Sequence, residues 1–181
     1  MMIFNYSLDQ DDYLTYLFYS TSKSKKVQKR RSLNKLILMI MYVVTGMYLH
    51  DRNGPIASAI FFLLCFPLYF LYNTFEKKQY LKHFKKFINH HFIDRIGKEA
   101  SIELAENNFH VVDDEDNWYA YEDIESVTET NALIIIQLKS GVAILLPKNK
   151  IQNVDALIEK LSQMASLKNI VLNKEPAWKW K

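Results

Sequence analysis

Three histidines that lie close together, His83, His90 and His91, are the side chains of this sequence best suited to binding a metal ion. The surrounding pattern is helical, and His90 and His91 are neighbours, so their side chains would point about 100° apart around the helix. His91 has no histidine four residues away on its own face. A metal site needs ligands that converge on one point. We therefore interpret the three residues as helix-surface histidines and expect neither a metal nor a cofactor.

The acidic turn Asp113–Asn117 is a second candidate site, because closely spaced carboxylates are typical calcium ligands. In the calcium loop of an EF-hand, oxygen ligands alternate, the sixth residue is glycine and the twelfth is glutamate. Counted from Asp114, Glu125 is the twelfth residue, but Trp118 and Tyr119 take the fifth and sixth places. We therefore interpret the segment as a solvated turn between two strands.

The sequence contains none of the compact motifs that identify common catalytic sites. It has no glycine-rich phosphate loop, no nucleophile elbow and no HExxH zinc motif. Cys65 is the only cysteine, which excludes a disulfide framework and a cysteine-based zinc site. We expect a protein that is not an enzyme.

Aromatic residues and nearby lysines form the best candidate surface for a protein partner. The expected surface combines three aromatic residues of one short segment with two later lysines: Trp118, Tyr119, Tyr121, Lys148 and Lys150. Alternatively, the aromatic side chains pack in the core or on a face of a sheet, as large apolar rings usually do. Both interpretations stay open at the level of the sequence.

Two apolar segments, Leu33–Leu49 and Gly54–Tyr72, dominate the first half of the chain. Lys35 is the one charge in the first segment, and the second segment has none. As helices they would be about 25 and 29 Å long, against about 30 Å for the hydrocarbon core of a bilayer. A helical hairpin buried in a soluble core would normally keep a polar stripe. We therefore predict a transmembrane hairpin over residues 33–74, with spans at 33–49 and 54–72.

Basic residues flank both outer ends of this hairpin. Seven lie between Ser22 and Lys35 and five lysines follow the second segment, whereas the connecting loop has one arginine. Positive residues favour the cytoplasmic side, so we predict a multi-pass protein of the cytoplasmic (inner) membrane with both termini in the cytoplasm. The residues expected to contact anionic lipid headgroups are Lys23, Lys25, Lys26, Lys29, Arg30, Arg31, Lys78 and Lys82. Alternatively, these charges set the topology and have no lipid partner.

The second half of the chain is acidic, since residues 98–175 contain fourteen acidic residues and seven lysines. Nucleic-acid-binding proteins usually carry their positive charge on the folded domain itself. Here the positive charge lies beside the apolar segments instead. We therefore expect a lipid bilayer as a partner and no nucleic acid.

Further helices are predicted on both sides of the hairpin. Residues 1–32 would form a short strand at Ile3–Tyr6 and then a helix that continues into the basic stretch. Ser7 and Gln10 have the spacing of a capping box at the start of this helix. Residues 75–97 would form an amphipathic helix next to the membrane, with apolar residues at helical spacing and lysines on another face.

From residue 98 onwards the side chains alternate with a period of two, which indicates strands. The expected strands are Ala100–Glu106, Phe109–Asp113, Trp118–Tyr121, Ile124–Thr130, Leu133–Lys139 and Val142–Leu146. A final helix at Val154–Ser166 has one apolar stripe that would cover the sheet. We predict an α+β membrane protein in which residues 98–168 form an antiparallel sheet capped by this helix, followed by a tail at 169–181.

The order of several short motifs resembles the YcxB-like family of bacterial membrane proteins. The motifs are Phe4-Asn5-Tyr6-Ser7-Leu8 with Asp12-Tyr13, Ser22-Lys23-Ser24-Lys25, the two apolar segments, WYAYEDI at Trp118–Ile124, Leu146-Pro147-Lys148 and the last helix. The match covers nearly the whole chain, and it depends on the order of the motifs rather than on any one of them. The resemblance implies a cytoplasmic domain similar to bacterial pleckstrin-homology-like (PH-like) folds, with no assigned reaction and no catalytic residues.

These observations lead to a leading hypothesis and an alternative. The chain would be a membrane-anchored, non-catalytic binding or regulatory module that presents its sheet domain to a protein partner or to a second copy of itself. Alternatively, the hairpin would pack against other membrane helices as a structural accessory subunit. The acidic charge of the domain disfavours phosphoinositide binding, because an anionic leaflet would repel it.

Overall fold

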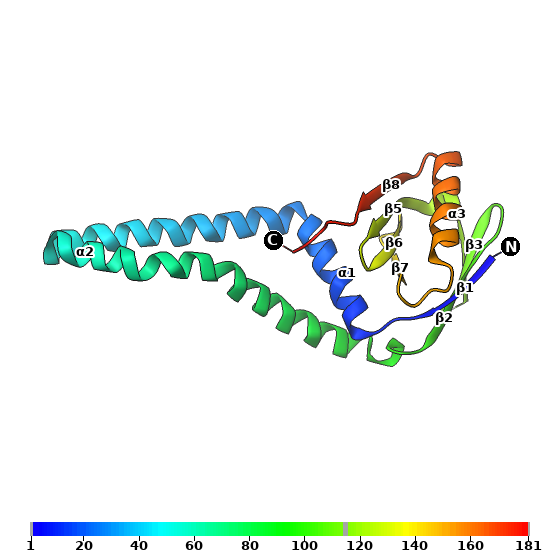
Figure 1. The fold of residues 1–181 in the computed structure, drawn as a ribbon, viewed down its shortest axis with the longest axis horizontal. Helices are drawn as coiled ribbons and strands as arrows, with labels where there is room; N and C mark the ends of the chain where they lie inside the picture. The colour runs from blue at the N-terminus through cyan, green and yellow to red at the C-terminus, as the bar shows by residue number, and fades with distance from the viewer. Residues whose placement is uncertain (1, 114–115, 181) are drawn as a thin grey trace. The chain divides into compact units, whose positions relative to one another are not determined.

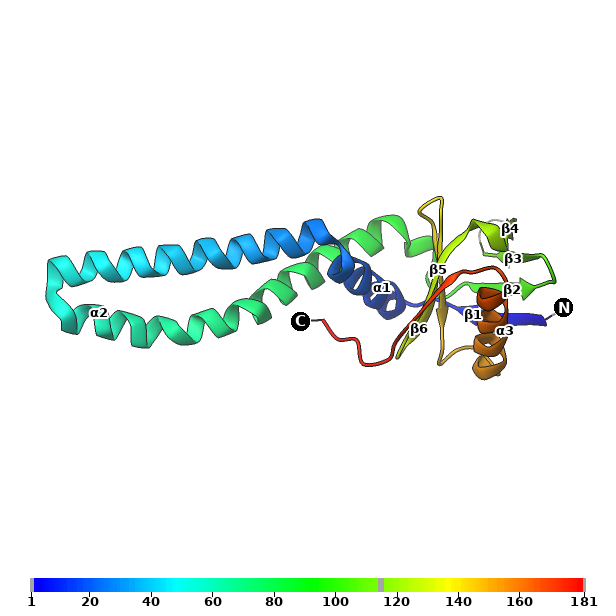
Figure 2. The ribbon, with the colours of Figure 1, turned by 90° about the horizontal axis from the view of Figure 1, so that it is seen from above.

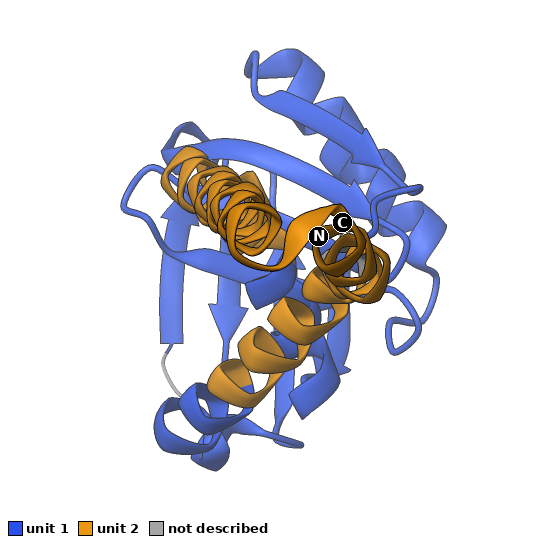
Figure 3. Ribbon diagram, turned by 90° about the vertical axis from the view of Figure 1, so that its left-hand side faces the viewer, with its two compact units in different colours: residues 1–18, 85–180 blue, residues 19–84, 181 orange. Residues whose placement is uncertain are grey.

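The computed structural model of the chain describes residues 2–113 and 116–180, apart from the side chains of Tyr69 and Phe70. The chain folds into two compact units (Figure 3). The helical unit consists of Tyr19–Phe84, and the sheet unit combines the described residues up to Phe18 with Lys85–Trp180. The sheet unit is therefore built from both ends of the chain, with the helical unit inserted between them.

The helical unit contains the end of α1 (Gln10–Lys23) and most of α2 (Lys25–His91). α2 is interrupted at Gly54, whose dihedral angles of φ 81° and ψ 176° are not helical. Glycine adopts a positive φ at little cost, and Pro55 suits the first turn of the next helix because it has no backbone N–H to pair. The chain therefore reverses at Gly54, and α2 forms two arms (Figures 1 and 2).

The position of this turn differs from the prediction. The sequence placed a non-helical link at residues 50–53, but these residues are helical in the structure. Polar side chains alone do not end a helix, whereas a positive φ followed by proline does. The predicted amphipathic helix at 75–97 is also not a separate element, because α2 continues to His91 and is followed by the 3-10 helix η1 (Ile93–Arg95).

The two arms of α2 lie side by side and contact each other at several levels (Figure 2). Arg31 of the first arm forms an ion pair with Glu76 of the second, with 2.9 Å between Nη2 and Oε2. Further along, the rings of Tyr42 and Phe62 are 5.7 Å apart. Gly46 faces the same ring, and a Cβ atom at Gly46 would overlap Cζ of Phe62. The absence of a side chain at Gly46 is therefore what allows this close approach.

Among the helices of the described residues, one is long and apolar enough to cross a membrane. It is the stretch Lys25–Leu68, which includes the turn at Gly54 and has a mean hydropathy of 1.5 in its most apolar window. Of that window, 6% is buried inside the protein, so its large apolar side chains are exposed. The predicted α+β class is thereby confirmed, and in place of the two predicted spans the described residues contain one candidate stretch.

The first sheet of the sheet unit is antiparallel, with the strand order β1-β2-β3-β4. Phe4 and Tyr6 are buried whereas Ile3 and Asn5 are exposed, which is the alternation of a strand with one covered face. The strand order leaves the first and last strands at the two edges. The strands are β1 (Met2–Ser7), β2 (Glu99–Leu104), β3 (Asn108–Val112) and β4 (Asp116–Ala120).

The second sheet is mixed, with the strand order β7-β6-β5-β8. Its strands are β5 (Ile124–Thr130), β6 (Leu133–Leu138), β7 (Ala143–Pro147) and β8 (Val171–Glu175). β8 follows α3 (Val154–Leu167) and pairs in parallel with β5. A parallel pair needs a long crossover connection, and the segment that contains α3 provides it.

These two sheets correct the prediction of a single antiparallel sheet. The strands β2 to β7 lie close to their predicted positions, and the predicted helix at Val154–Ser166 is confirmed. The pairing differs, because β1 joins β2 across the inserted helical unit, and the expected tail at 169–181 contributes β8. A short strand carries no local signal for its partner, since pairing depends on a distant strand that covers the correct face.

The core of the sheet unit lies between the inner faces of the two sheets and α3. α3 contributes Leu157, Leu161 and Met164, whose spacing of four and three residues places them on one face of the helix. Phe109 and Tyr121 are the largest side chains that are completely buried there. The aromatic segment around β4 is therefore partly a core element.

A reciprocal cap fixes the start of α1. The Asp9 carboxylate accepts hydrogen bonds from the backbone N–H groups of Asp11 and Asp12, both at 2.9 Å. In return, the Asp12 carboxylate accepts the N–H of Asp9 at 3.0 Å. This is the capping-box arrangement, but Asp9 and Asp12 form it in place of the predicted Ser7 and Gln10. Carboxylates suit this position because the N-terminus of a helix carries partial positive charge.

Candidate functional site

A groove with a volume of about 370 Å³ lies beside β1, between this strand and the loop after β7. An edge strand presents backbone N–H and C=O groups that no neighbouring strand pairs with. The groove therefore combines such backbone groups with mainly polar side chains. Its lining consists of five residues of β1, one of β2 and two of the loop: Ile3, Phe4, Asn5, Tyr6, Ser7, Glu99, Lys150 and Gln152.

Lys150 lines this groove but is already paired. Its Nζ lies 2.7 Å from the carboxylate of Asp9 and 2.6 Å from that of Asp12. Burial alone would lower the pKa of Lys150, but the hydrogen bonds to Asp12 and Asp9 outweigh it and raise the pKa. The hydrogen bond from Lys150 also holds the pKa of Asp9 below its usual range. Lys150 thus joins the loop to the capped end of α1 and does not act as a free cation for a ligand.

Tyr6 marks the buried side of the groove. Burial raises the pKa of its phenol group above the usual range, and the nearby Asp113 and Tyr13 raise it further. The hydroxyl therefore stays protonated across the ordinary pH range and remains a hydrogen-bond donor. The Tyr6 side chain therefore offers the groove a hydrogen-bonding group.

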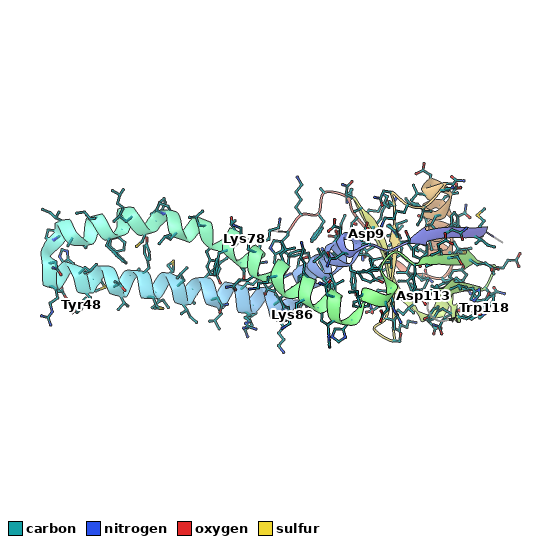
Figure 4. The ribbon with its side chains drawn as sticks, turned by 90° about the horizontal axis from the view of Figure 1, so that it is seen from below. Asp9, Tyr48, Lys78, Lys86, Asp113 and Trp118 are labelled. Carbon is teal, nitrogen blue, oxygen red and sulfur yellow. The ribbon has the colours of Figure 1, made fainter. Side chains whose placement is uncertain are left out.

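The outer face of the first sheet carries a row of side chains in register across all four strands. From β1 to β4 these are Ile3, Glu103, His110 and Trp118. The rings of His110 and Trp118 stack 4.3 Å apart, only 7° from parallel. His110 also contacts the Asp116 carboxylate and lies 3.9 Å from Glu103. Trp118, labelled in Figure 4, and Ile3 lie on opposite edge strands and are 57% and 58% exposed.

The three aromatic residues expected on one partner surface have different surroundings. Trp118 is exposed, whereas Tyr119 is half-buried and stacks on Phe109 with ring centroids 5.4 Å apart. Tyr121 is completely buried and donates a hydrogen bond from its hydroxyl to the carbonyl oxygen of Ala105 at 3.0 Å. Burial also raises the pKa of Tyr121. Tyr121 is therefore a core residue, because its ring completes the packing of the sheet unit.

The two expected lysines do not join Trp118 either. Lys148 forms an ion pair with Glu129 of β5 at 2.7 Å, in the second sheet. Lys150 lies beside β1, and β1 is separated from β4 by two intervening strands. The spacing of neighbouring strands is about 4.8 Å, so the two edges lie on the order of 14 Å apart. The structure thus divides the predicted surface into an exposed tryptophan, a half-buried tyrosine, a core tyrosine and two paired lysines.

The histidines of α2 and the acidic turn are the two places where the sequence suggested a metal site. In the described part of the chain, no group of three or more histidine, cysteine, aspartate or glutamate side chains is placed to hold a metal ion. His91 packs against Phe87 with ring centroids 4.5 Å apart. Within the acidic turn, Asp114 and Glu115 lie outside the described residues, and Asp116 contacts His110.

The basic residues flanking the apolar segments also differ from one another. Arg31 forms an ion pair with Glu76, and both side chains are largely shielded from solvent. Lys23 lies over the ring of Tyr19, 5.3 Å from its centroid. The remaining residues expected to meet lipid headgroups are exposed: Lys25, Lys26, Lys29, Arg30, Lys78 (Figure 4) and Lys82.

The sequence indicated part of the groove and missed the rest. Lys150 was among the predicted partner-surface residues, and Ile3–Tyr6 was predicted as a strand without a binding role. No local pattern connects Glu99 or Gln152 with the other groove residues, because their proximity depends on strand pairing and on the path of a loop.

No family model matches the chain, and the comparison with curated proteins finds no match.

Proposed function

We propose that this chain is a membrane-anchored, non-catalytic binding module whose sheet unit binds an extended peptide segment of a cytoplasmic protein at the edge of β1. The observation that carries the proposal is the combination of an edge strand with an adjoining groove of about 370 Å³. Peptides that add a strand to a sheet gain affinity from main-chain hydrogen bonds and specificity from pockets beside the edge. Both elements are present at β1.

The polar lining of the groove supports main-chain recognition. Asn5, Ser7 and Gln152 offer neutral hydrogen-bonding groups, and the charge of Lys150 is balanced by Asp9 and Asp12. The groove therefore offers no unpaired lysine to an acidic peptide, while an extended backbone can pair with β1. The exposed Ile3 provides an apolar contact at one end.

The helical unit supplies the anchor in this proposal. Its two arms are joined at Gly54, and their apolar side chains, such as Leu63 at 76% exposure, need a covering that a lipid bilayer provides. Each arm would form one span, and the exposed basic residues at the open end of the hairpin would keep both termini in the cytoplasm. The two arms expose large apolar side chains along much of their length, and a contiguous exposed apolar surface typically marks a membrane or protein contact.

The sheet unit in this proposal is PH-like, and the chain is a member of the YcxB-like family. The support is the element order: a four-stranded antiparallel sheet, a second sheet, and then a helix that packs on both. The hairpin would be an insertion between the first and second strands of that domain. This arrangement explains why the short motif near Tyr6 and the motif near Trp118 belong together in one domain.

The proposal is tested by photo-cross-linking in native membranes. The full chain carries a photo-reactive amino acid in place of Asn5 in one version and in place of Trp118 in another. We expect cross-links to a defined protein at position 5 and not at position 118. The cross-linked partner peptide, identified by mass spectrometry, should then bind the purified full chain directly.

Two lysine substitutions provide a matched pair for this assay. Ile3→Lys and Trp118→Lys each place a charge on an equally exposed apolar position at opposite edges of one sheet. A charge on an edge strand blocks strand addition, so Ile3→Lys should weaken peptide binding by about tenfold and Trp118→Lys by less than about twofold. The reverse pattern would assign binding to the aromatic face instead and contradict the proposed site.

Replacing the helical hairpin by an unrelated one tests the alternative role as an accessory subunit. If partner binding survives the replacement, the sheet unit carries the function, as proposed. If binding is lost while the sheet unit stays folded, the hairpin itself holds the partner and the binding-module proposal fails.

A further inference from the structure

A polar pocket lies in the helical unit, between the two arms of α2, and its volume is about 340 Å³. Arg30 and Asn34 of the first arm line one side. The second arm lines the other side with Tyr72, Glu76, Gln79, Tyr80 and His83. Residues three, four or seven apart share one face of a helix, so each arm turns a single polar stripe towards the pocket.

The pocket contains one positive charge without a counter-charge. Glu76 is neutralised by Arg31, whose Nη2 lies 2.9 Å from Oε2 of Glu76. Arg30, by contrast, has no ion-pair partner among the described residues and remains exposed. The uncharged donors Asn34 and Gln79 stand beside it in the pocket lining. An anion with additional hydrogen-bonding groups fits this combination, because arginine binds phosphate oxygens in a bidentate manner.

The position of the pocket along the two arms indicates that the anion is a lipid headgroup. Arg30 precedes the first apolar segment by three residues, and Tyr72 is the last residue of the second. If the arms span a membrane, as proposed above, the pocket opens where the hydrocarbon core meets the headgroup layer. Tyr72 and Tyr80 suit that layer, because tyrosine prefers the membrane interface. Lipid phosphates are concentrated at this level.

We propose that this pocket binds the headgroup of an acidic phospholipid whose phosphate carries a hydroxylated group, as in phosphatidylglycerol. Arg30 binds the phosphate, and Asn34 and Gln79 hydrogen-bond the hydroxyl groups. Glu76 does not repel the lipid, since Arg31 balances its charge. The pocket thereby gives the hairpin a preference for one class of lipid, which diffuse attraction to exposed lysines does not provide.

Native mass spectrometry of the full chain, purified in micelles with equal amounts of phosphatidylglycerol and phosphatidylcholine, tests the inference. We expect preferential retention of phosphatidylglycerol, and about fivefold weaker retention in Arg30→Gln. Lys77→Gln is the matched control, because it removes one positive charge from an exposed residue next to Glu76 that does not line the pocket and is not among the predicted headgroup contacts. It should change retention by less than about twofold. Equal losses in both variants, or no preference in the native chain, would overturn the proposal.

A second variant and a soluble competitor complete the test. Gln79→Glu adds a negative charge to the pocket, so it should abolish the preference while the helix content, followed by circular dichroism, stays unchanged. Retention of the preference in a folded Gln79→Glu chain would contradict the assigned pocket. Soluble glycerol phosphate at the same concentration should not displace the lipid. Displacement would show that the pocket takes a free phosphate ester and would overturn the lipid assignment.

The inference rests on the proposed insertion of the hairpin, and the two can fail separately. Extraction of cell membranes with alkaline carbonate measures insertion alone. A chain that is released by carbonate contradicts the proposed anchor and the lipid inference with it. A chain that stays in the membrane but shows no lipid preference contradicts the pocket assignment alone.

Discussion

The Nζ atom of Lys150 lies 2.6 Å from the carboxylate of Asp12, although 138 residues separate the two in the sequence. Together with Asp9, this pair ties the loop after β7 to the first turn of α1. Lys150→Met keeps the length of the side chain but removes the charge. We expect the free energy of unfolding of the sheet unit to fall by about 1–2 kcal/mol at pH 7. All three tryptophans, Trp118, Trp178 and Trp180, belong to this unit, so tryptophan fluorescence during denaturation measures it.

The cost of Lys150→Met should depend on pH. The pKa of Asp9 is lowered in the folded chain, so its contribution is complete above its ordinary pKa of about 4 and is lost as the pH falls through the lower folded value. The pKa of Lys150 is raised, so its contribution is complete below about 10.4 and is lost as the pH rises through the higher folded value. The difference between native chain and variant should therefore be largest between about pH 5 and 10. A cost that is the same at pH 3 and pH 7 would contradict this pairing.

The Arg31–Glu76 pair predicts a strong effect of removing one partner only. In Arg31→Gln, the shielded Glu76 carboxylate loses its counter-charge, which costs about 3 kcal/mol in the stability of the helical unit. The double variant Arg31→Gln with Glu76→Gln should recover most of this loss, because no unpaired charge remains. Far-UV circular dichroism during denaturation in mixed micelles provides the measurement. If Arg31→Gln is no more costly than the exposed control Lys29→Gln, the two arms are not joined by this pair.

The contact between Gly46 and Phe62 predicts a steric effect within the hairpin. A side chain at Gly46 would overlap the Phe62 ring, so Gly46→Val should destabilise the packed arms by about 1–3 kcal/mol. Phe62→Ala creates space at the same place, so the double variant should be more stable than the sum of the single effects predicts. Strictly additive effects, measured in the same micelle assay, would place the two residues apart.

Tyr121 predicts a separation between stability and binding. Tyr121→Phe removes the hydrogen bond to Ala105 but keeps the ring, and it should lower the stability of the sheet unit by about 1 kcal/mol. Tyr121→Ala leaves a cavity in the core and should cost about 3–5 kcal/mol. Binding of the partner peptide to folded Tyr121→Phe should be unchanged. A stable Tyr121→Phe chain that fails to bind the peptide would show that Tyr121 contributes to the partner-binding surface.

Local sequence patterns predicted the positions of strands and helices better than the pairing between strands. The strand predicted at Ile124–Thr130 coincides with β5, and the stripe at Leu157, Leu161 and Met164 faces the core as expected. Alternation and helical spacing depend only on which face of an element is covered, so they can be read within a few residues. The parallel pairing of β8 with β5 left no such trace, because Val171–Glu175 is short and mixed in polarity.

The candidate sites show the same difference between what residue type indicates and what depends on long-range contacts. Trp118 and Arg30 were chosen as candidates from residue type, and the structure shows that both are exposed. Their expected contacts with a protein partner and with lipid headgroups stay predictions. The state of Tyr121 and Lys150 was not identifiable in this way. A tyrosine next to a strand is equally compatible with core and surface, and a lysine shows its partner only when distant segments meet.

The sequence by itself determined the apolar hairpin-forming stretch, the separation of basic and acidic segments and the kinds of secondary structure, because each depends on composition and local periodicity. The tertiary structure alone decided that the helical unit is inserted between two strands of one sheet, that Arg31 meets Glu76, and that a groove adjoins β1. These features arise from contacts between residues far apart in the chain. Such contacts are selected by the total free energy of packing and pairing, which no local segment contains.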